Sequence, residues 1–456
     1  MEINVHPNAE ENFNNKALEV LAAINSKQEE DETDKKLVSP IEMYPQFNIT
    51  VDQIVPGSFR TWDTNSEGNK TAFYFDHGGK WFGVSGSSFG LMCEVIEGVK
   101  NLEVFKDILG LDFVTEQFQN WLVSKYLSTD SSVDFIAYLK KSAHDQVEDR
   151  TVLVPISNLV ISNTVEFGNV SLKPLSRSWF KSLRNRSLSN PELEDAEGIE
   201  NYFDEIKNKH VGYAVMEISV FSEPSLATER AIIEAERSAK LLGLYSPHCT
   251  SINTKSHCKI YGSGDVESVT CYQVYGDYGF IGSQKSVSVD TAEGNLWILD
   301  QGEMKWCKER NFEVVSKLLR EENLCEYEQT VLNSLLIYSR AAFTSDAMEK
   351  LVFTLSALES FLLKNKSEPI QQNLADRFAY YITRTPEYRA SLVSEIKEVY
   401  AIRSDYLHHG LNSNESKKLM SFFTQVFGFY YVVLSNINQF SSKKDFFDFI
   451  DRLKYS

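Results

Sequence analysis

Hydrophobic positions along the chain follow two different patterns, and the change comes near residue 311. Upstream, short runs that alternate apolar and polar residues predict strands, with helical runs between them. Downstream, apolar side chains recur three or four residues apart, as they do along one face of a helix. In the clearest such run, residues 346 to 363, these positions are Met348, Leu351, Val352, Leu355, Leu358 and Leu362. The pattern predicts an α+β region followed by an all-α helical bundle.

The upstream pattern predicts strands and helices in mixed order. The expected strands are Thr71 to Phe75, Lys80 to Ser85, Val152 to Ile161, Val165 to Leu172 and Gly212 to Phe221, with shorter ones between Lys259 and Leu299. The expected helices are Thr115 to Ser128, Glu194 to Lys209 and Ser225 to Leu242. Because Asn163 and Gly168 favour turns, we expect an antiparallel pair around them.

Three segments follow from these patterns. Residues 1–38 are expected to be a flexible acidic lead-in, with a short helix near Ala17 to Ile24. Residues 39–310 are expected to be an α+β regulatory or sensing region that divides near residue 150. Residues 311–456 are expected to be an up-and-down helical domain. Its expected helices are Glu328 to Phe343, Asp346 to Leu363, Ile370 to Thr383, Glu387 to about His409, Glu415 to Phe440 and Lys444 to Lys454.

The chain is acidic overall, but its charge is not uniform. The formal net charge of -18 argues against broad affinity for nucleic acid, since phosphate binding needs clustered Lys and Arg. From Glu326 to the end, however, fifteen basic side chains balance fifteen acidic ones. The C-terminal segment can therefore carry a local basic site.

The spacing of the cysteines and the first residues of the chain indicate the cellular compartment in which the protein is expected. Six cysteines are scattered without a CxxC pair, and no basic and apolar leader begins the chain. Reduced thiols in the cytoplasm are therefore expected.

The uncharged run from Leu419 to Ser442 is long enough to span a bilayer. Its amide and hydroxyl side chains are costly in lipid, so a buried helix or a subunit contact is favoured and no stable membrane association is expected.

The aromatic residues of this run have almost no positive charge between them, which favours a place in a hydrophobic core over a platform on which bases stack. They are Phe422, Phe423, Phe427, Phe429, Tyr430 and Tyr431.

The residues best suited to chemistry lie near the end of an expected helix, in the run Arg403-Ser404-Asp405-Tyr406-Leu407-His408-His409-Gly410. Arg is permanently charged and suits a phosphate, while His exchanges a proton near neutral pH. Asp405 precedes His408 by three residues and His409 by four, so on a helix its carboxylate can reach either imidazole and raise its pKa. The plainer interpretation is that the cations complement the helix dipole and Gly410 ends the helix.

Helix geometry places Arg403 and His408 about 140° apart around the axis and about 7.5 Å apart along it. They are therefore not a stacked pair within one chain. If the same helix of a second copy lay antiparallel to this one, the Arg of each chain could meet the His of the other across a two-fold axis. The geometry favours a composite site in a homodimer.

Three helical segments carry a resemblance to a known family. They are Ser356-Ala357-Leu358-Glu359-Ser360-Phe361-Leu362-Leu363, Leu374-Ala375-Asp376-Arg377-Phe378, and the run from Tyr400 to Gly410. Over residues 326–456 the chain resembles the HEPN superfamily, in particular its Apea-like branch. The resemblance implies a helical-bundle ribonuclease with an Arg-x(4 to 6)-His motif, acting as a dimer without metal or cofactor.

The resemblance also implies roles for particular residues. Arg403 would bind the phosphate and His408 would be the motif His, with His409, at a five-residue gap, as the alternative. Many members have Asn, Asp or His directly after the Arg, whereas this chain has Ser404 there and Asp405 one residue later. The role of the auxiliary polar residue therefore stays open.

Two further residues of the resembling segments, Glu359 and Arg377, would lie on helices beside the site. Either could contact the substrate or support Arg403, and ordinary ion pairs are the alternative. The implied function is an endoribonuclease that cuts RNA, for example a transfer RNA, in antiviral defence or toxin-like growth arrest with a phage-derived trigger. The alternative is a non-catalytic HEPN-like protein that binds RNA or dimerises, since the fold does not guarantee activity.

Two other motifs suggest different chemistry. Gly86-Ser87-Ser88-Phe89-Gly90 matches the G-x-S-x-G nucleophile elbow, but no parallel βα series follows, so a glycine-rich hairpin is expected. His248-Cys249 and His257-Cys258 offer four soft ligands, yet adjacent His and Cys side chains seldom converge on one ion. No metal site is therefore expected.

Overall fold

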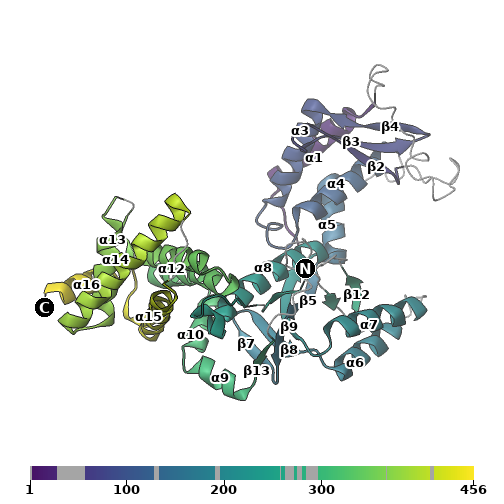
Figure 1. Cartoon of the computed structure of the whole chain (residues 1–456). Helices are drawn as coiled ribbons and strands as arrows, with labels where there is room; N and C mark the ends of the chain where they lie inside the picture. Colours follow the sequence, from purple (N-terminus) through teal and green to yellow (C-terminus); the bar gives the residue numbers. More distant parts are fainter. Residues whose placement is uncertain are drawn as a thin grey trace. The chain divides into compact units, whose positions relative to one another are not determined.

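The structure is a computed structural model, shown in Figure 1. It describes residues 3–27, 57–127, 133–189, 196–256, 258–261, 272–274, 280–283, 296–365, 367–410 and 415–455. The chain forms two compact units: unit 1 comprises residues 1–150 and 221–229, and unit 2 comprises residues 151–220 and 230–456. Strands and helices alternate in mixed order as far as β13 (Trp297–Leu299), and the described residues beyond it form helices, as the hydrophobic pattern predicts.

Unit 1 is built on a four-stranded antiparallel sheet with the order β1-β4-β3-β2. Its strands are β1 (Asn25–Ser26), β2 (Arg60–Thr64), β3 (Lys70–His77) and β4 (Lys80–Ser85). Its helices are α1 (Pro7–Ala22), α3 (Gly86–Lys100), α4 (Leu111–Tyr126) and α5 (Phe135–Gln146). Along β3 the side chains alternate, so that Phe73 and Phe75 join the main core while Tyr74 lies on the other face. The expected strands at 71–75 and 80–85 are confirmed.

The beginning of the chain departs from the expected flexible lead-in. Residues 7–22 form α1, a helix of 16 residues, rather than a short helix near Ala17 to Ile24. Ala17 and Val20 are fully buried in the core of unit 1. The prediction of a flexible arm is therefore wrong for these residues, because a few apolar positions on one helix face suffice to dock it. The acidic run that follows lies outside the described residues.

The segment from Gly86 to Gly90 is not the expected hairpin. β4 ends at Ser85 and α3 begins at Gly86, whose φ of +56° favours glycine at this sharp turn. The local backbone thus resembles a nucleophile elbow, but the sheet is antiparallel rather than parallel. In the part of the chain that the structure describes, no imidazole hydrogen-bonds Ser88, so the structure shows no base that would make Ser88 a nucleophile.

The first part of unit 2 is a sheet with the order β12-β11-β5-β9-β8-β7, and β10 also pairs with β5. The strands are β5 (Glu148–Ser157), β7 (Val165–Phe167), β8 (Val170–Pro174), β9 (Ala214–Ser222), β10 (Lys259–Ile260), β11 (Tyr272–Val274) and β12 (Phe280–Ser283). Apolar side chains of α6 (Arg177–Leu188) and α7 (Ala196–His210) pack on Leu153 and Val215 of the sheet. After β9 comes α8 (Pro224–Leu242).

Residues with positive φ divide two of the expected strands. The expected strand from Val152 to Ile161 breaks at Asn158, where φ is +55°, into β5 and β6 (Leu159–Ile161). The segment from Val165 to Leu172 turns at Gly168, where φ is +65°, and forms the antiparallel pair of β7 and β8. The expected antiparallel pair is confirmed. The break at Asn158 was missed because apolar residues continue on both sides of it.

The C-terminal part of unit 2 is helical, and its later helices are drawn green to yellow in Figure 1. The helices are α9 (Gln301–Lys308), α10 (Phe312–Arg320), α11 (Glu326–Tyr338), α12 (Ala347–Leu362), α13 (Ile370–Ile382), α14 (Pro386–His409), α15 (Ser416–Ser435) and α16 (Lys443–Tyr455). Aromatic rings from different helices meet in the core. Phe361 and Phe446 have ring centroids 4.9 Å apart, as do Phe378 and Phe429.

The expected C-terminal helices are found, with two ends corrected. The helix expected to end at Phe343 is α11, which ends at Tyr338 and continues as the 3-10 turn η5 (Ser339–Phe343). The helix expected to end at Phe440 is α15, which ends at Ser435. The core prediction is confirmed for four of the aromatic residues of α15, since Phe422, Phe423, Phe429 and Tyr430 are buried. Among the described residues, no helix has the length and apolar character of a membrane span.

A lysine is enclosed in the helical part. Lys350 of α12 is fully buried, and its Nζ donates a 2.6 Å hydrogen bond to the main-chain carbonyl of His248 in the 3-10 turn η4 (Pro247–Cys249). Burial lowers the pKa of Lys350 from its ordinary value of 10.5 to about 8. The charged form of this side chain therefore lowers the free energy of unfolding at neutral pH.

We expect the wild-type chain to gain stability relative to a Lys350→Met variant as the pH rises from about 8 to about 10.5. Within this pH window Lys350 keeps its proton in the unfolded chain but has released it in the folded chain. Below the window Lys350 is protonated in both states, so the folded chain bears the full free-energy cost of burying the charged group. The difference between the two pKa values corresponds to a gain of roughly 3 kcal/mol in the free energy of unfolding. Urea unfolding of both proteins across this pH range measures the difference.

Lys305→Met provides the control, because the Lys305 side chain is 79% exposed. Its stability difference from wild type should stay nearly constant with pH. Parallel curves for the wild type and Lys350→Met would contradict the expected titration of Lys350.

Candidate functional site

The predicted motif lies in the last two turns of α14. The helix ends at His409, and Gly410 adopts a left-handed conformation with φ +65° while its N–H donates to the carbonyls of Asp405 and Tyr406. The predicted helix end at Gly410 is confirmed. Both histidines thus occupy the final turn, where a cation also complements the helix dipole.

Arg403 and Glu359 form an ion pair that joins α14 to α12. The Arg403 Nη1 lies 2.7 Å from Glu359 Oε1, and each side chain is 21% exposed. The same oxygen accepts a 2.9 Å hydrogen bond from the Tyr400 hydroxyl, one turn earlier on α14. The structure therefore brings Glu359 to Arg403, in a supporting position.

One buried N–H group of Arg403 lacks a partner in the part of the chain that the structure describes. Its Nε is buried and has no hydrogen-bond partner among the described residues. A guanidinium has five N–H donors, and leaving a buried one unpaired costs free energy. An anion is the acceptor that would satisfy such a group, and planar oxyanions suit the fork of an arginine. Arg403 therefore has an N–H group that lacks a partner in the described residues, while Glu359 holds its Nη1.

The imidazoles are exposed at the same end of α14. His408 and His409 have ring centroids 6.4 Å apart. Within the described residues, neither forms a hydrogen bond or ion pair with Asp405, and Ser404 and Asp405 are also exposed. The expected contact of Asp405 with an imidazole is thus not formed, because exposed charge pairs gain little free energy over hydration. Among the residues that the structure describes, no hydrogen bond or ion pair orients either ring toward Arg403.

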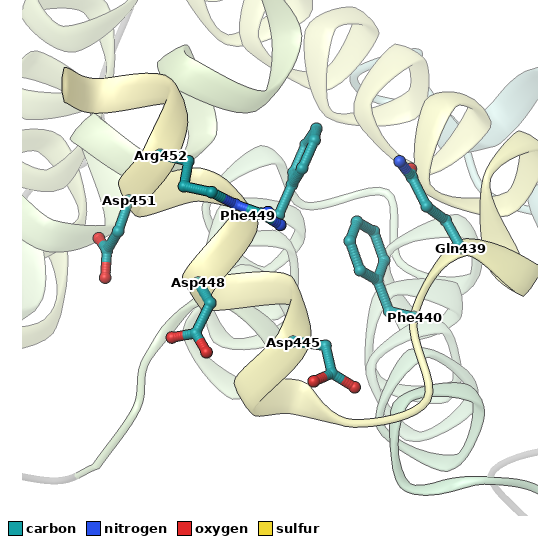
Figure 2. A pocket seen from close by; sticks show the side chains of 7 residues that line it. All are labelled: Gln439, Phe440, Asp445, Asp448, Phe449, Asp451 and Arg452. Atoms are coloured by element: carbon teal, nitrogen blue, oxygen red, sulfur yellow. The ribbon is translucent and has the colours of Figure 1, made fainter. Parts of the chain in front are cut away.

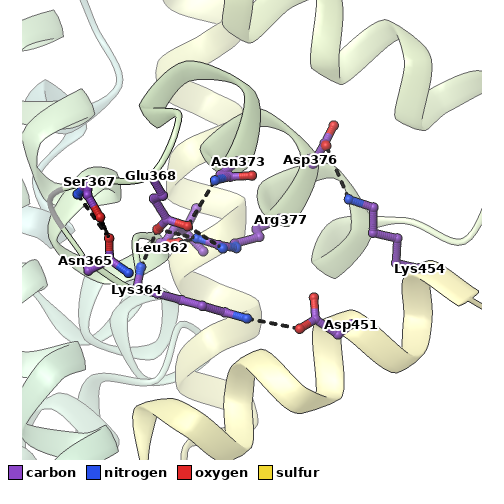
Figure 3. Close-up of polar contacts among 10 residues, drawn as sticks. All are labelled: Leu362, Lys364, Asn365, Ser367, Glu368, Asn373, Asp376, Arg377, Asp451 and Lys454. Carbon is purple, nitrogen blue, oxygen red and sulfur yellow. Dashed lines mark hydrogen bonds and ion pairs between the residues drawn. The ribbon is translucent and has the colours of Figure 1, made fainter.

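Arg377 is held elsewhere, in the network of Figure 3. Its Nη1 and Nη2 donate to the two carboxylate oxygens of Glu368 at 2.8 and 2.7 Å, and Nη1 also donates to the carbonyl of Leu362. These hydrogen bonds hold the pKa of Glu368 below its ordinary value. The guanidinium also lies 4.7 Å from the ring centroid of Phe447 on α16. Arg377 therefore joins helices as an ordinary ion pair and is not brought to Arg403.

A surface hollow of about 710 Å³ lies along α16 (Figure 2). Its lining residues are Gln439, Phe440, Asp445, Asp448, Phe449, Asp451 and Arg452. Asp445 accepts a hydrogen bond from the Ser442 N–H, and Asp451 pairs with Lys364 at 3.0 Å. None of the predicted site residues lines this hollow.

Two of the alternative metal ligands, Cys249 and Cys258, are buried thiols. Burial raises the pKa of Cys249 to about 11 and that of Cys258 to about 12, whereas zinc binds thiolates. His257 lies outside the described residues. Among those described, no three His, Cys, Asp or Glu side chains are grouped to hold a metal ion.

Comparison with known proteins adds no assignment to this geometry. No protein-family model, curated protein or solved structure matches the chain. The likeness to HEPN ribonucleases therefore rests on the quoted segments of residues 326–456, and the function is a proposal.

Tyr400 is the site residue that the sequence reasoning missed. It precedes Arg403 by three residues, so the two side chains share a face of α14. That spacing was an available signal. It could not reveal that this face turns toward Glu359, because the packing of α14 on α12 is a tertiary contact.

Proposed function

We propose that the chain is a metal-independent endoribonuclease of the HEPN type, with its site built around Arg403. The observation that carries the proposal is a half-buried arginine that Glu359 holds by one nitrogen while its Nε lacks a partner in the described residues. Two exposed imidazoles lie at the same helix end. Cleavage of a phosphodiester without a metal needs at least a fixed cation that binds the phosphate and a group that exchanges a proton near neutral pH.

In the proposed reaction, a ribose 2'-hydroxyl attacks the adjacent phosphorus, and the bond from phosphorus to the 5'-oxygen of the next nucleotide breaks. An imidazole accepts the proton of the 2'-hydroxyl or donates one to the leaving 5'-oxygen. Arg403 stabilises the negative charge that develops on the phosphate oxygens. The products are a 2',3'-cyclic phosphate and a 5'-hydroxyl, and DNA, which lacks the nucleophile, is not cut.

The helix geometry of one chain does not direct Arg403 and His408 to one phosphate, since they lie about 140° apart around α14. We therefore propose a homodimer through the helical domain, in which Arg403 of one copy and His408 of the other share the phosphate. The α+β region would restrain or direct the nuclease. A cytoplasmic role in antiviral defence or growth arrest, with a phage-derived trigger, rests on the family resemblance alone.

Incubation of the purified protein with transfer RNA or total RNA in the presence of EDTA tests the proposed activity. We expect fragments with 2',3'-cyclic phosphate and 5'-hydroxyl ends, and no cleavage of a substrate that carries a 2'-deoxyribose at the cut nucleotide. Fragments with 3'-hydroxyl ends, or cleavage that requires a metal, would contradict the mechanism. Binding without cleavage would instead favour the non-catalytic HEPN-like alternative.

A further inference from the structure

Tyr400 is linked to Arg403 through a single oxygen atom. Glu359 Oε1 accepts both the Tyr400 hydroxyl, at 2.9 Å, and the Arg403 Nη1, at 2.7 Å. Tyr400 is partly buried where α14 packs on α12. Hydrogen bonds to an ionised carboxylate are roughly twice as strong as neutral ones, so the contact restrains all three side chains.

The shared oxygen explains how Arg403 is presented. Arginine and carboxylate often pair through two parallel hydrogen bonds, which would occupy both sides of the fork. Here Arg403 reaches Glu359 through Nη1 alone, and its Nε is left unpaired within the described residues. The tyrosine hydroxyl restrains the rotation of the carboxylate, and the carboxylate in turn sets the direction of the guanidinium.

The hydroxyl of Tyr400 keeps its proton under all ordinary assay conditions. Burial, together with the adjacent Glu359 carboxylate, raises the pKa of Tyr400 well above its ordinary value of 10.0. It therefore acts only as a donor to Glu359 and does not exchange protons with a substrate.

We propose that Tyr400 is a positioning residue for the ribonuclease reaction, which acts through Glu359 to hold Arg403 in the orientation that meets the phosphate. The inference rests on the proposed function. It adds a residue that belongs neither to the Arg-His motif nor to its flanking polar positions.

A double-mutant cycle of Tyr400→Phe and Glu359→Ala, assayed by RNA cleavage, tests the proposal. Tyr400→Phe keeps the ring and removes only the hydroxyl, and it should lower kcat roughly tenfold with KM little changed, as expected for one hydrogen bond to a charged group. In the Glu359→Ala background the same change should have no further effect, since no acceptor remains to link the Tyr400 hydroxyl to Arg403. Tyr431→Phe, at an exposed position on α15, is the matched control and should cleave at the wild-type rate.

The outcomes separate this inference from the proposed function. The positioning role is overturned if Tyr400→Phe has the wild-type kcat, or if it lowers kcat equally in both backgrounds. In either case an inactive Arg403→Ala variant would leave the proposed function standing. A lower unfolding temperature with an unchanged kcat of the folded fraction would also overturn the positioning role, by showing a structural role only. If Arg403→Ala cleaves like the wild type, the proposed function itself fails.

Discussion

Replacing Arg403 by alanine is expected to lower the rate of RNA cleavage by roughly a thousandfold while the chain remains folded. The substitution removes the guanidinium that Glu359 holds at the proposed phosphate position. Because the pair is 21% exposed, water can reach the unpaired Glu359 and the loss of stability should be small. Initial cleavage rates and thermal unfolding, measured on the same preparation, check both parts.

Two further variants sharpen this result. Arg403→Lys keeps a positive charge but not the planar fork, so it should recover only a small part of the activity. Arg384→Ala is the matched control, because Arg384 is exposed just before α14 begins and donates a hydrogen bond to the Tyr380 carbonyl of α13. Cleavage by Arg403→Ala at the rate of this control would rule out the phosphate role of Arg403.

Replacing His408 by alanine is expected to lower cleavage by roughly 10²- to 10⁴-fold, the range of a lost general acid or base. His409→Ala should retain most of the activity, since the resemblance favours His408 as the motif His. Both imidazoles are exposed, so neither change should alter the unfolding temperature. The reverse order of effects would assign the catalytic role to His409.

A mixing experiment tests whether the site is shared between two copies. When inactive Arg403→Ala and His408→Ala chains are refolded together, half of the dimers are mixed. Each mixed dimer holds one intact pairing of Arg and His, so about a quarter of the wild-type activity should return. If both residues of a site came from one chain, no activity would return.

The helical half of the fold could be predicted from the sequence because its signals are local. Apolar residues at helical spacing, the N-cap at Asp346 and the stop at Gly410 mark their own helices. The helix α1 was missed as a folded element because only two of its side chains, Ala17 and Val20, are fully buried. A polar helix with so narrow an apolar face resembles a mobile arm until its partner surface is known.

The candidate site could be predicted in part. Residue types and spacing single out Arg403, Asp405, His408 and His409, and the family resemblance favours Arg403 and His408 as the motif pair. The sequence did not reveal that only one of the two expected neighbours, Glu359 and Arg377, lies at the site. Glu359 pairs with Arg403, whereas Arg377 pairs with Glu368. Both carry charges on helices of the same bundle, and only the rotation of each helix about its axis decides which charge each one meets.

By itself, the sequence determined the order of α+β and helical regions, the ends of α14 and the chemical types gathered at its C-terminus. These depend on hydrophobic period, caps and side-chain chemistry, which act over a few residues. The tertiary structure alone decided that α14 turns Tyr400 and Arg403 toward one oxygen of Glu359 and leaves the imidazoles in solvent. That arrangement depends on how helices distant in the sequence pack against one another, which no local pattern encodes.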